Sequence, residues 1–138
     1  MDKDKSKASE IIEGMMKKDY FSQWMGIERM EEGEGFCTLK MTIREEMCNG
    51  FGIAHGGISY SLADSALAFA SNSHGPQAVS LETSITHIRP LTAGDIIVAS
   101  AKEIHLSRKI GHYDVRIEKG NGELVALFRG IVYIRSGK

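Results

Sequence analysis

Apolar and polar positions repeat with a helical period at the start of the chain and with a strand period soon afterwards. Apolar residues recur every four positions from Ile12, which predicts an amphipathic helix over residues 9–25. Ser9 is the expected N-cap of this helix. The charged residues 1–7 lack the period and are expected to form a flexible tail. Residues 35–43 alternate between apolar and polar side chains, as a β-strand does.

The next helical segment, from about residue 57 to residue 72, is apolar or small on nearly every side. Ile58 and Leu62 belong to its apolar stripe, and alanine and serine fill most of the remaining surface. A helix of this composition is buried against other elements. Asp64 is the only acidic residue in it. The sequence therefore raises the question of what a carboxylate does in the middle of a buried helix.

Four longer runs with the alternation of β-strands follow this helix. Short turns separate the last three, which should therefore pair antiparallel, and Asn121-Gly122 predicts a type I′ hairpin turn. In the first run, strict alternation places Ser80 on the same face as Glu82, opposite Leu81. The four runs cover residues 78–88, 95–107, 112–120 and 123–135.

The order of these elements predicts the fold class. One strand, a buried helix and a meander of strands, preceded by an extra helix, are typical of an α+β domain. A single curved antiparallel β-sheet wrapped round the long central helix satisfies this order. A chain of 138 residues fits one such domain, expected over residues 8–138.

Composition and charge exclude several classes of partner. The formal net charge is −1, so no general electrostatic attraction to nucleic acid or to an anionic membrane is expected. The N-terminus has no apolar signal-peptide core, and no apolar run reaches the roughly 18 residues of a membrane span. These features predict a cytoplasmic protein.

The residues typical of metal and disulfide sites are few and widely spaced. Cys37 and Cys48 are the only cysteines, and two cysteines make neither a disulfide framework nor a zinc site. The histidines show no ligand spacing. The chain has no glycine pattern for nucleotide binding and no G-x-S-x-G elbow. We therefore expect no metal and no redox cofactor.

The tripeptide His55-Gly56-Gly57, where the buried helix starts, is the first candidate for chemistry. A helix start leaves backbone N–H groups unpaired at the positive end of the helix dipole. Such a group can polarise a carbonyl or hold an oxyanion. The alternative interpretation is a glycine turn that only lets the loop and the helix pack closely.

Asp64 is the second candidate. A buried carboxylate must be paired, protonated or functional. Burial without a cation raises the pKa of a carboxyl group, which suits a general base or nucleophile near neutral pH. The alternative is that this side of the helix faces water.

The spacing between Gly56 and Asp64 limits how the two can act together. Eight residues of helix separate them, a distance of about 12 Å along the axis. A reacting carbonyl carbon must lie about 3 Å from both its nucleophile and its oxyanion donor. One chain therefore cannot easily supply both groups, but two copies with antiparallel helices can. A site built on these residues would be shared across a homodimer and occur twice.

The segment from Asn49 to Asp64 reads N-G-x-G-x-x-H-G-G-x-x-x-x-L-A-D. It resembles the active-site segment of the hotdog-fold acyl-CoA thioesterases, in particular that of the phenylacetate-degradation (PaaI-type) branch. The similarity continues in R-P-x-x-A-G-D at residues 89–95 and in V-A-L-F-R-G at residues 125–130, and it covers nearly all of residues 20–135.

This resemblance implies a role for each matched residue. Asp64 would be the nucleophile or the general base that activates water, and the Gly56 backbone N–H would polarise the thioester carbonyl. Asn49 and His55 match loop residues that orient the thioester and shape the site. A serine on the following strand assists water in some members of the family, and by position this residue would be Ser80.

The resemblance also implies contacts to CoA and an assembly of subunits. Family dimers hold two active sites at their interface and commonly pair into homotetramers. Basic loop residues contact the phosphates and pantetheine of CoA, although solvated surface charge is the alternative interpretation of these residues. The candidate substrate contacts are Gly57, Arg89, Ser107, Arg108 and Lys109.

The predicted function is hydrolysis of an acyl-CoA thioester, phenylacetyl-type or a related aryl-acyl one, to free acid and CoA. The thiolate leaves readily, so a carboxylate and an oxyanion donor suffice, and CoA enters only as part of the substrate. Two alternatives stay open: a hotdog module that binds acyl-CoA without hydrolysing it, and an enoyl-CoA hydratase. Asp64 argues against the pure binder, whereas the presence of both His55 and Asp64 leaves the hydratase open.

Overall fold

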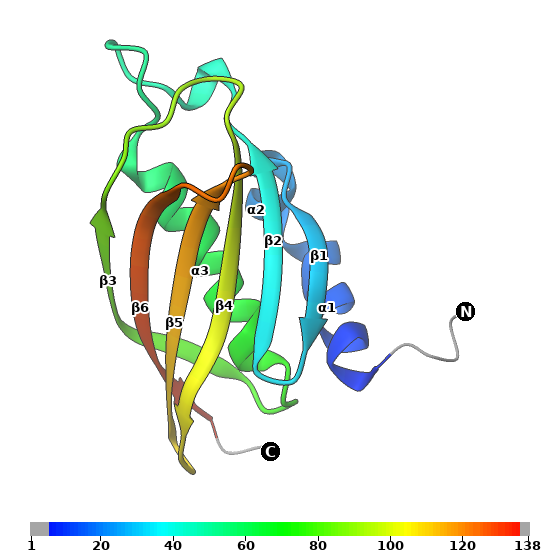
Figure 1. The fold of residues 1–138 in the computed structure, drawn as a ribbon. Helices are drawn as coiled ribbons and strands as arrows, with labels where there is room; N and C mark the ends of the chain where they lie inside the picture. Colours follow the sequence, from blue (N-terminus) through cyan, green and yellow to red (C-terminus); the bar gives the residue numbers. More distant parts are fainter. Residues whose placement is uncertain (1–5, 136–138) are drawn as a thin grey trace.

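The computed structural model describes residues 6–135, which form one curved β-sheet with helices on its concave side (Figure 1). The helices are α1 (Lys7–Lys18), α2 (Tyr20–Met25), the short 3-10 helix η2 (Glu45–Met47) and α3 (Gly56–Asn72). The strands are β1 (Glu28–Gly33), β2 (Phe36–Thr42), β3 (Ala78–His87), β4 (Ile96–Leu106), β5 (Ile110–Lys119) and β6 (Leu124–Ile134). α3 crosses the middle of the concave side, and α1 and α2 lie beside it behind β1 and β2.

The sheet has six strands in the order β1-β2-β4-β5-β6-β3, and every neighbouring pair is antiparallel. β1 and β3 are therefore its two edges. The predicted α+β hotdog fold, a sheet wrapped round a central helix with an extra helix in front, is confirmed. The predicted antiparallel pairing of the last three strands is confirmed as well.

Small side chains allow the sheet to approach α3 closely. Leu62 and Phe69 of this helix are fully buried against it. Gly130 of β6 shows how tight the contact is, because a Cβ atom there would lie 2.6 Å from Cδ2 of Leu67. Any larger residue at this position would force the helix or the strand to move. Although α3 is apolar, no helix in the described part of the chain is long and apolar enough to cross a membrane.

Two helices replace the single N-terminal helix that the sequence predicted. Ser6, and not Ser9, is the N-cap of α1, since its side chain accepts a hydrogen bond from the Ser9 N–H at 3.0 Å. α1 thus begins inside the expected tail, whose residues 1–5 lie outside the described part of the chain. Asp19 separates the helices: its Oδ1 accepts from the Ser22 N–H at 3.0 Å and caps α2. A short polar side chain that bonds nearby backbone commonly interrupts a helix in this way.

The sequence pattern does not predict β1. Its sequence, ERMEEG, has no apolar alternation, and half of its residues are exposed at the edge of the sheet while none is buried. Pairing with β2 nevertheless holds it in an extended conformation. Charged side chains are common on edge strands because they discourage pairing with another chain.

A β-bulge in β3 changes which side chains face α3. The pairing of β3 with β6 shifts between Ser80 and Glu82, which leaves Leu81 as an extra residue. Ser80 pairs with the buried Val132, so it shares the α3 side with Thr83 and not the outer face with Glu82. The predicted strict alternation is therefore wrong here, because a bulge reverses the phase of a strand.

The hairpin between β5 and β6 forms where Asn121-Gly122 predicts it, but the turn is not type I′. The Gly122 N–H donates to the Lys119 carbonyl at 2.8 Å, which makes Gly120 and Asn121 the central residues. A type I′ turn needs a positive φ at both central positions. Positive φ occurs at Gly122 (+89°) and not at Gly120.

Candidate active site

The N-terminus of α3 presents free backbone donors. His55 is the N-cap, with φ −58° and ψ 141°, and the helix starts at Gly56. Within the described residues, neither a carbonyl nor a side chain accepts a hydrogen bond from the N–H of Gly56 or Gly57. These groups lie at the positive end of the helix dipole, where an oxygen carrying negative charge is stabilised.

Asn49 holds together the glycine-rich loop in front of α3. Its Oδ1 accepts hydrogen bonds from the N–H groups of Phe51 (2.9 Å) and Ile53 (3.2 Å). Its backbone N–H donates to the Ile53 carbonyl at 2.8 Å, and an isolated bridge between Cys48 and Ala54 closes the loop. The Asn49 oxygen is therefore occupied within the loop. Its side-chain NH₂ group finds no acceptor among the described residues.

A cavity of about 320 Å³ opens at this end of α3. Gly56 and Ser59 line it from the helix, His55 lines it from the preceding loop, and His87 and Arg89 line it from the end of β3 and the chain that follows. The remaining wall is apolar and consists of Ile53, Ala54, Ile88, Pro90 and Leu91. Gly56, the first residue of the helix, thus borders a space that a ligand can enter.

His87 also lines this cavity, although the spacing of the histidines in the sequence indicates no site there. A Cβ atom added to Gly56 would lie 3.0 Å from its Nε2. Its other ring nitrogen, Nδ1, lies 3.4 Å from the Oγ of Ser59, and the same hydroxyl lies 3.2 Å from the Gly56 carbonyl oxygen. No local motif identifies such a residue, since only the return of β3 along α3 brings it to the start of the helix.

Asp64 is half-buried on the side of α3 that the sheet leaves uncovered. Burial raises the pKa of its carboxyl group above the ordinary value, and the nearby carboxylate of Asp19 raises it further. Asp19 comes close because it caps α2, which packs on α3 through hydroxyl groups of Ser22 and Ser65 that lie 2.8 Å apart. A raised pKa in a partly desolvated setting suits a proton acceptor that works near neutral pH.

Tyr60 joins the exposed side of α3 to the edge strand β3. Its hydroxyl lies 2.5 Å from Oγ1 of Thr83, and its ring meets that of Phe128 edge-on, with centroids 5.5 Å apart. Ser80 precedes Thr83 on the α3 side of the same strand. Three strand residues span about 10 Å, so Ser80 lies further along α3 towards its C-terminal end than the contact between Tyr60 and Thr83.

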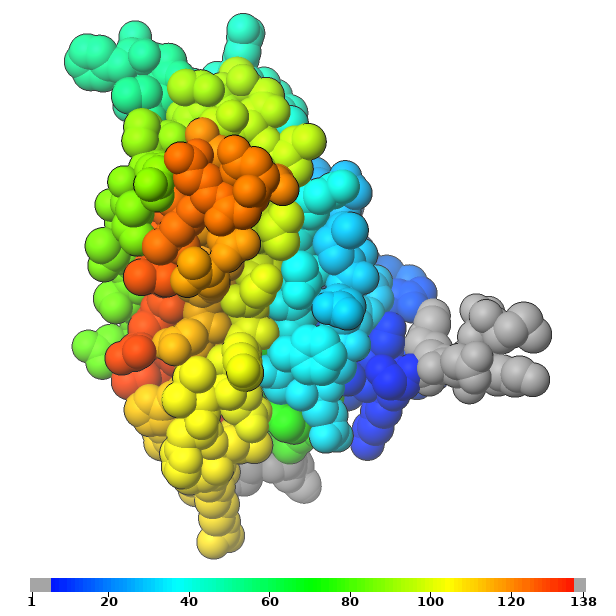
Figure 2. Space-filling model, in the orientation of Figure 1, coloured from blue at the N-terminus to red at the C-terminus, as the bar shows by residue number. Residues whose placement is uncertain are grey.

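The predicted CoA contacts are divided between two ends of the molecule. Arg89 lines the cavity at Gly56, where its Nη1 donates to the Leu124 carbonyl (2.7 Å) and its Nε pairs with the Glu123 carboxylate (3.0 Å). The turn of residues 107–109 joins β4 to β5 at the far end of the sheet. Figure 2 shows this yellow hairpin at the bottom and the turquoise loop before α3 at the top. One chain therefore does not bring the two groups together.

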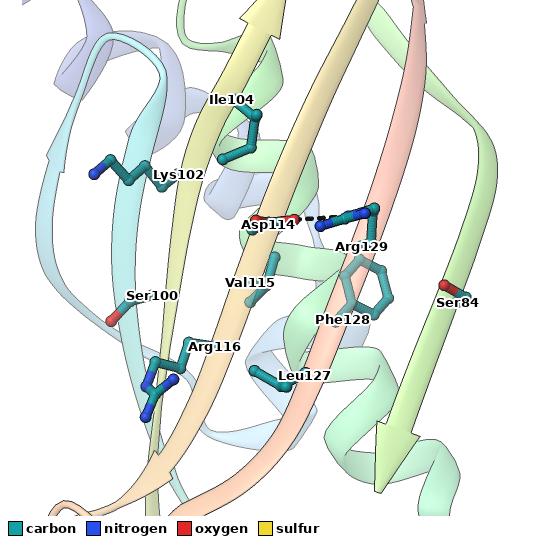
Figure 3. Close-up of a pocket in the computed structure, with 10 residues that line it drawn as sticks. All are labelled: Ser84, Ser100, Lys102, Ile104, Asp114, Val115, Arg116, Leu127, Phe128 and Arg129. Carbon is teal, nitrogen blue, oxygen red and sulfur yellow. Dashed lines mark hydrogen bonds and ion pairs between the residues drawn. The ribbon is translucent and has the colours of Figure 1, made fainter.

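A second cavity, of about 670 Å³, lies on the outer side of the sheet, with α3 behind it (Figure 3). Lys102, Arg116 and Arg129 give it cationic walls, and the Nε of Arg129 donates to Oδ1 of Asp114 at 2.9 Å. The sheet separates this cavity from the start of α3.

Metal-binding side chains do not cluster in the described part of the chain. No three His, Cys, Asp or Glu residues there are arranged to hold an ion. Burial raises the pKa of the Cys37 thiol to about 12, so this cysteine stays protonated and unreactive. That catalysis needs no metal remains a prediction from the sequence.

Comparison with known proteins identifies the family of this fold and site. The sequence model of the thioesterase superfamily matches residues 51–126. The acyl-coenzyme A thioesterase PaaI of Escherichia coli is 39% identical over 124 residues, which cover 90% of this chain and 89% of that protein. Human acyl-coenzyme A thioesterase 13 is 29% identical over 121 residues, covering 85% of this chain and 86% of that protein.

The similarity extends to the three-dimensional structure. The solved structure of the E. coli PaaI protein superposes with a TM-score of 0.93 at 37% identity and covers 96% of both chains. The superfamily match begins within the loop, at residue 51, and includes the start of α3 and Asp64. The chain is therefore a PaaI-type hotdog-fold protein and belongs to the thioesterase superfamily.

Proposed function

We propose that the protein hydrolyses acyl-CoA thioesters at two equivalent sites, each combining Gly56 of one chain with Asp64 of a second copy. The separation of these residues on α3 carries the proposal. They lie eight residues apart on one continuous helix, about 12 Å along its axis. Antiparallel pairing of two such helices brings each Gly56 next to the other chain's Asp64 and makes both sites by one symmetry operation.

The surface around β3 supports this pairing. β3 is an edge strand, so its outer backbone groups are unpaired within the chain. Val79 and Leu81 on it are 43% and 59% exposed. Beside it, α3 shows the small, half-exposed side chains of Ser61 and Ala68 on either side of Asp64. Small residues let two helices approach closely, so the same face can accept a second copy.

The chemistry needs only groups that this chain supplies. The thioester carbonyl oxygen accepts a hydrogen bond from the Gly56 N–H. As a general base, Asp64 takes a proton from water while the water oxygen bonds to the carbonyl carbon. The oxyanion then collapses, the carbon–sulfur bond breaks, and CoA leaves as a thiolate that takes up a proton. As a nucleophile, Asp64 would instead form a mixed anhydride that water hydrolyses to the same products.

The flanking polar residues have supporting roles in this proposal. The free NH₂ group of Asn49 and the exposed His55 orient the thioester, and Ser80 helps to hold the water. Gly57 offers a second free backbone N–H. Arg89 contacts CoA from one chain, and Ser107, Arg108 and Lys109 contact it only if the assembly brings their turn near. No step uses a metal, so turnover should survive treatment with a chelator.

The proposed acyl group is aryl, of the phenylacetyl type. Support comes from the E. coli relative named acyl-coenzyme A thioesterase PaaI, whose structure is described as that of a protein from the phenylacetic acid degradation operon. A turnover panel of phenylacetyl-, benzoyl-, short-chain and long-chain acyl-CoA, followed by free thiol release, tests the proposal. The aryl esters should have the highest kcat/KM, and an enzyme that releases no thiol from any ester would contradict it.

Assembly is tested separately by mass. Light scattering should give a dimer, or a homotetramer in which two dimers pair, as the sequence predicts. A monomer at assay concentration would remove the shared site. Incubation with an enoyl-CoA, with water addition followed by absorbance, distinguishes hydrolysis from the hydratase alternative.

A further inference from the structure

His87 stands beside the proposed carbonyl-binding N–H of Gly56 and has no part in the mechanism above. We infer that His87 is a further catalytic residue, whose Nε2–H is the second hydrogen-bond donor to the thioester oxygen. This inference rests on the proposed function, because it assumes that an acyl carbonyl binds at Gly56.

The distances allow one oxygen to bond both groups. The imidazole Nε2 lies 3.0 Å from the point where a Cβ on Gly56 would stand. Within a residue, the amide nitrogen and that point are about 2.5 Å apart. The Gly56 nitrogen and Nε2 are therefore at most about 5.5 Å apart. An oxygen with bonds of about 2.9 Å to each can bridge nitrogens separated by up to about 5.8 Å.

The directions agree with the distances. The N–H of a first helical residue points out of the helix towards its N-terminal side, and the Cα–Cβ direction tilts the same way. The imidazole and the free N–H therefore face the same space, the cavity of about 320 Å³ that both residues line. The absence of a side chain at position 56 leaves that space open between them.

Ser59 orients the ring. Its hydroxyl lies 3.4 Å from Nδ1 of His87, and Ser59 itself is only 3% exposed. The hydroxyl proton is donated to the Gly56 carbonyl oxygen at 3.2 Å, so the Ser59 oxygen accepts from the Nδ1–H of His87. A ring that donates at both Nδ1 and Nε2 is an imidazolium, so in this inference His87 acts in its protonated form, with its positive charge beside the thioester oxygen. Ser59 acts through His87 and is a positioning residue.

Turnover of the purified full-length enzyme tests the inference with matched variants. His87→Phe keeps a ring against Gly56 but removes the donor, and kcat should fall by roughly 10- to 100-fold with KM changed less than about twofold. His87→Gln, which restores an N–H donor, should recover part of the loss. His105→Phe makes the same change at an exposed strand position remote from the cavity and should leave kcat unchanged. A His87→Phe enzyme with wild-type kcat would overturn the inference.

A binding experiment separates this inference from the proposed function. Two CoA analogues are compared: a ketone in which CH₂ replaces the sulfur of phenylacetyl-CoA, and S-phenethyl-CoA, which lacks the carbonyl. Wild-type protein should prefer the ketone, and His87→Phe should reduce that preference by roughly 3- to 10-fold. Thermal melting confirms that both variants fold. If the wild type hydrolyses no ester, the proposed function fails. The donor role of His87 is rejected separately, if His87→Phe binds the ketone over S-phenethyl-CoA with the same preference as the wild type.

Discussion

Asp64 lies just over two helical turns after Gly56 on α3, half-buried beside Asp19, while Gly56 faces a cavity at the start of the helix. Within one chain, the carboxylate of Asp64 and the free N–H of Gly56 therefore lie on different parts of the surface. This separation makes a shared site the simplest arrangement in which both act on one carbonyl. It also makes the proposal open to tests that treat the two residues independently.

The side chain of Asp64 can be neutralised with little change of shape. Asp64→Asn should lower kcat by roughly 10²- to 10⁴-fold, because the proton acceptor is lost. Free thiol release measures this loss. Asp114→Asn, which neutralises a carboxylate on the outer side of the sheet, is the matched control and should keep wild-type turnover. Asp64→Asn turnover within a few-fold of wild type would rule out Asp64 as base or nucleophile.

Mixed dimers can show that the two groups come from different chains. Gly56→Val fills the space in front of the N–H, and Asp64→Asn removes the base, so each pure variant should have little activity. After unfolding and refolding together in equal amounts, half of the dimers are mixed and each mixed dimer has one intact site. Activity should return to about a quarter of the wild-type value by this symmetry argument. Two variants that stay inactive after mixing would place both groups in one chain.

The raised pKa of Asp64 predicts how activity depends on pH. The reaction needs the carboxylate, so kcat/KM should fall as the pH decreases through the raised pKa, at a higher pH than an unperturbed aspartate would give. A pH–rate profile of kcat/KM measures this limb. A profile that stays flat down to the ordinary pKa of aspartate would show that Asp64 is not desolvated in the working enzyme.

The raised pKa of Asp64 also predicts how the stability of the fold depends on pH. Activity should rise with pH, whereas the contribution of Asp64 to stability should fall. Burial favours the protonated form of Asp64 in the folded chain. Its contribution to stability is therefore full below the ordinary pKa and is lost as the pH rises through the raised value. Asp64→Asn removes this loss, so its Tm should exceed that of the wild type by more at pH 7 than at pH 4. An equal difference at both pH values would contradict the cause given for the shift.

Two glycines provide a paired test of packing. Gly130→Ala places a Cβ atom 2.6 Å from Leu67 and should destabilise the fold by roughly 1–3 kcal/mol. Gly14→Ala, inside α1 with no atom within 4 Å of the added Cβ, should stabilise it by roughly 0.5–1 kcal/mol. Urea unfolding of both variants gives the two values. A stable Gly130→Ala protein would mean that α3 packs less tightly on β6 than the structure shows.

Features determined by local periodicity were predictable from the sequence. The buried helix from Gly56 to Asn72 and the strands after it follow from apolar spacing. Features determined by a side-chain hydrogen bond or by an irregular strand register were not. Asp19 divides the N-terminal helix because its carboxylate caps the second half, and the bulge at Leu81 reverses the phase of β3. Neither the helix break at Asp19 nor the bulge at Leu81 changes the composition or the apolar period enough to be recognised in the sequence.

The sequence by itself determined the two chemical groups and their spacing. The chain has a glycine at the start of a buried helix and a single carboxylate eight residues later. Because an α-helix rises by a fixed distance per residue, this spacing in the sequence fixes their separation along the helix. Tertiary structure decided the environment of these groups. The antiparallel return of β3 brings His87 to Gly56, and α2 places Asp19 near Asp64. Both contacts join residues distant in sequence, and they exist only because the sheet and helices pack round α3.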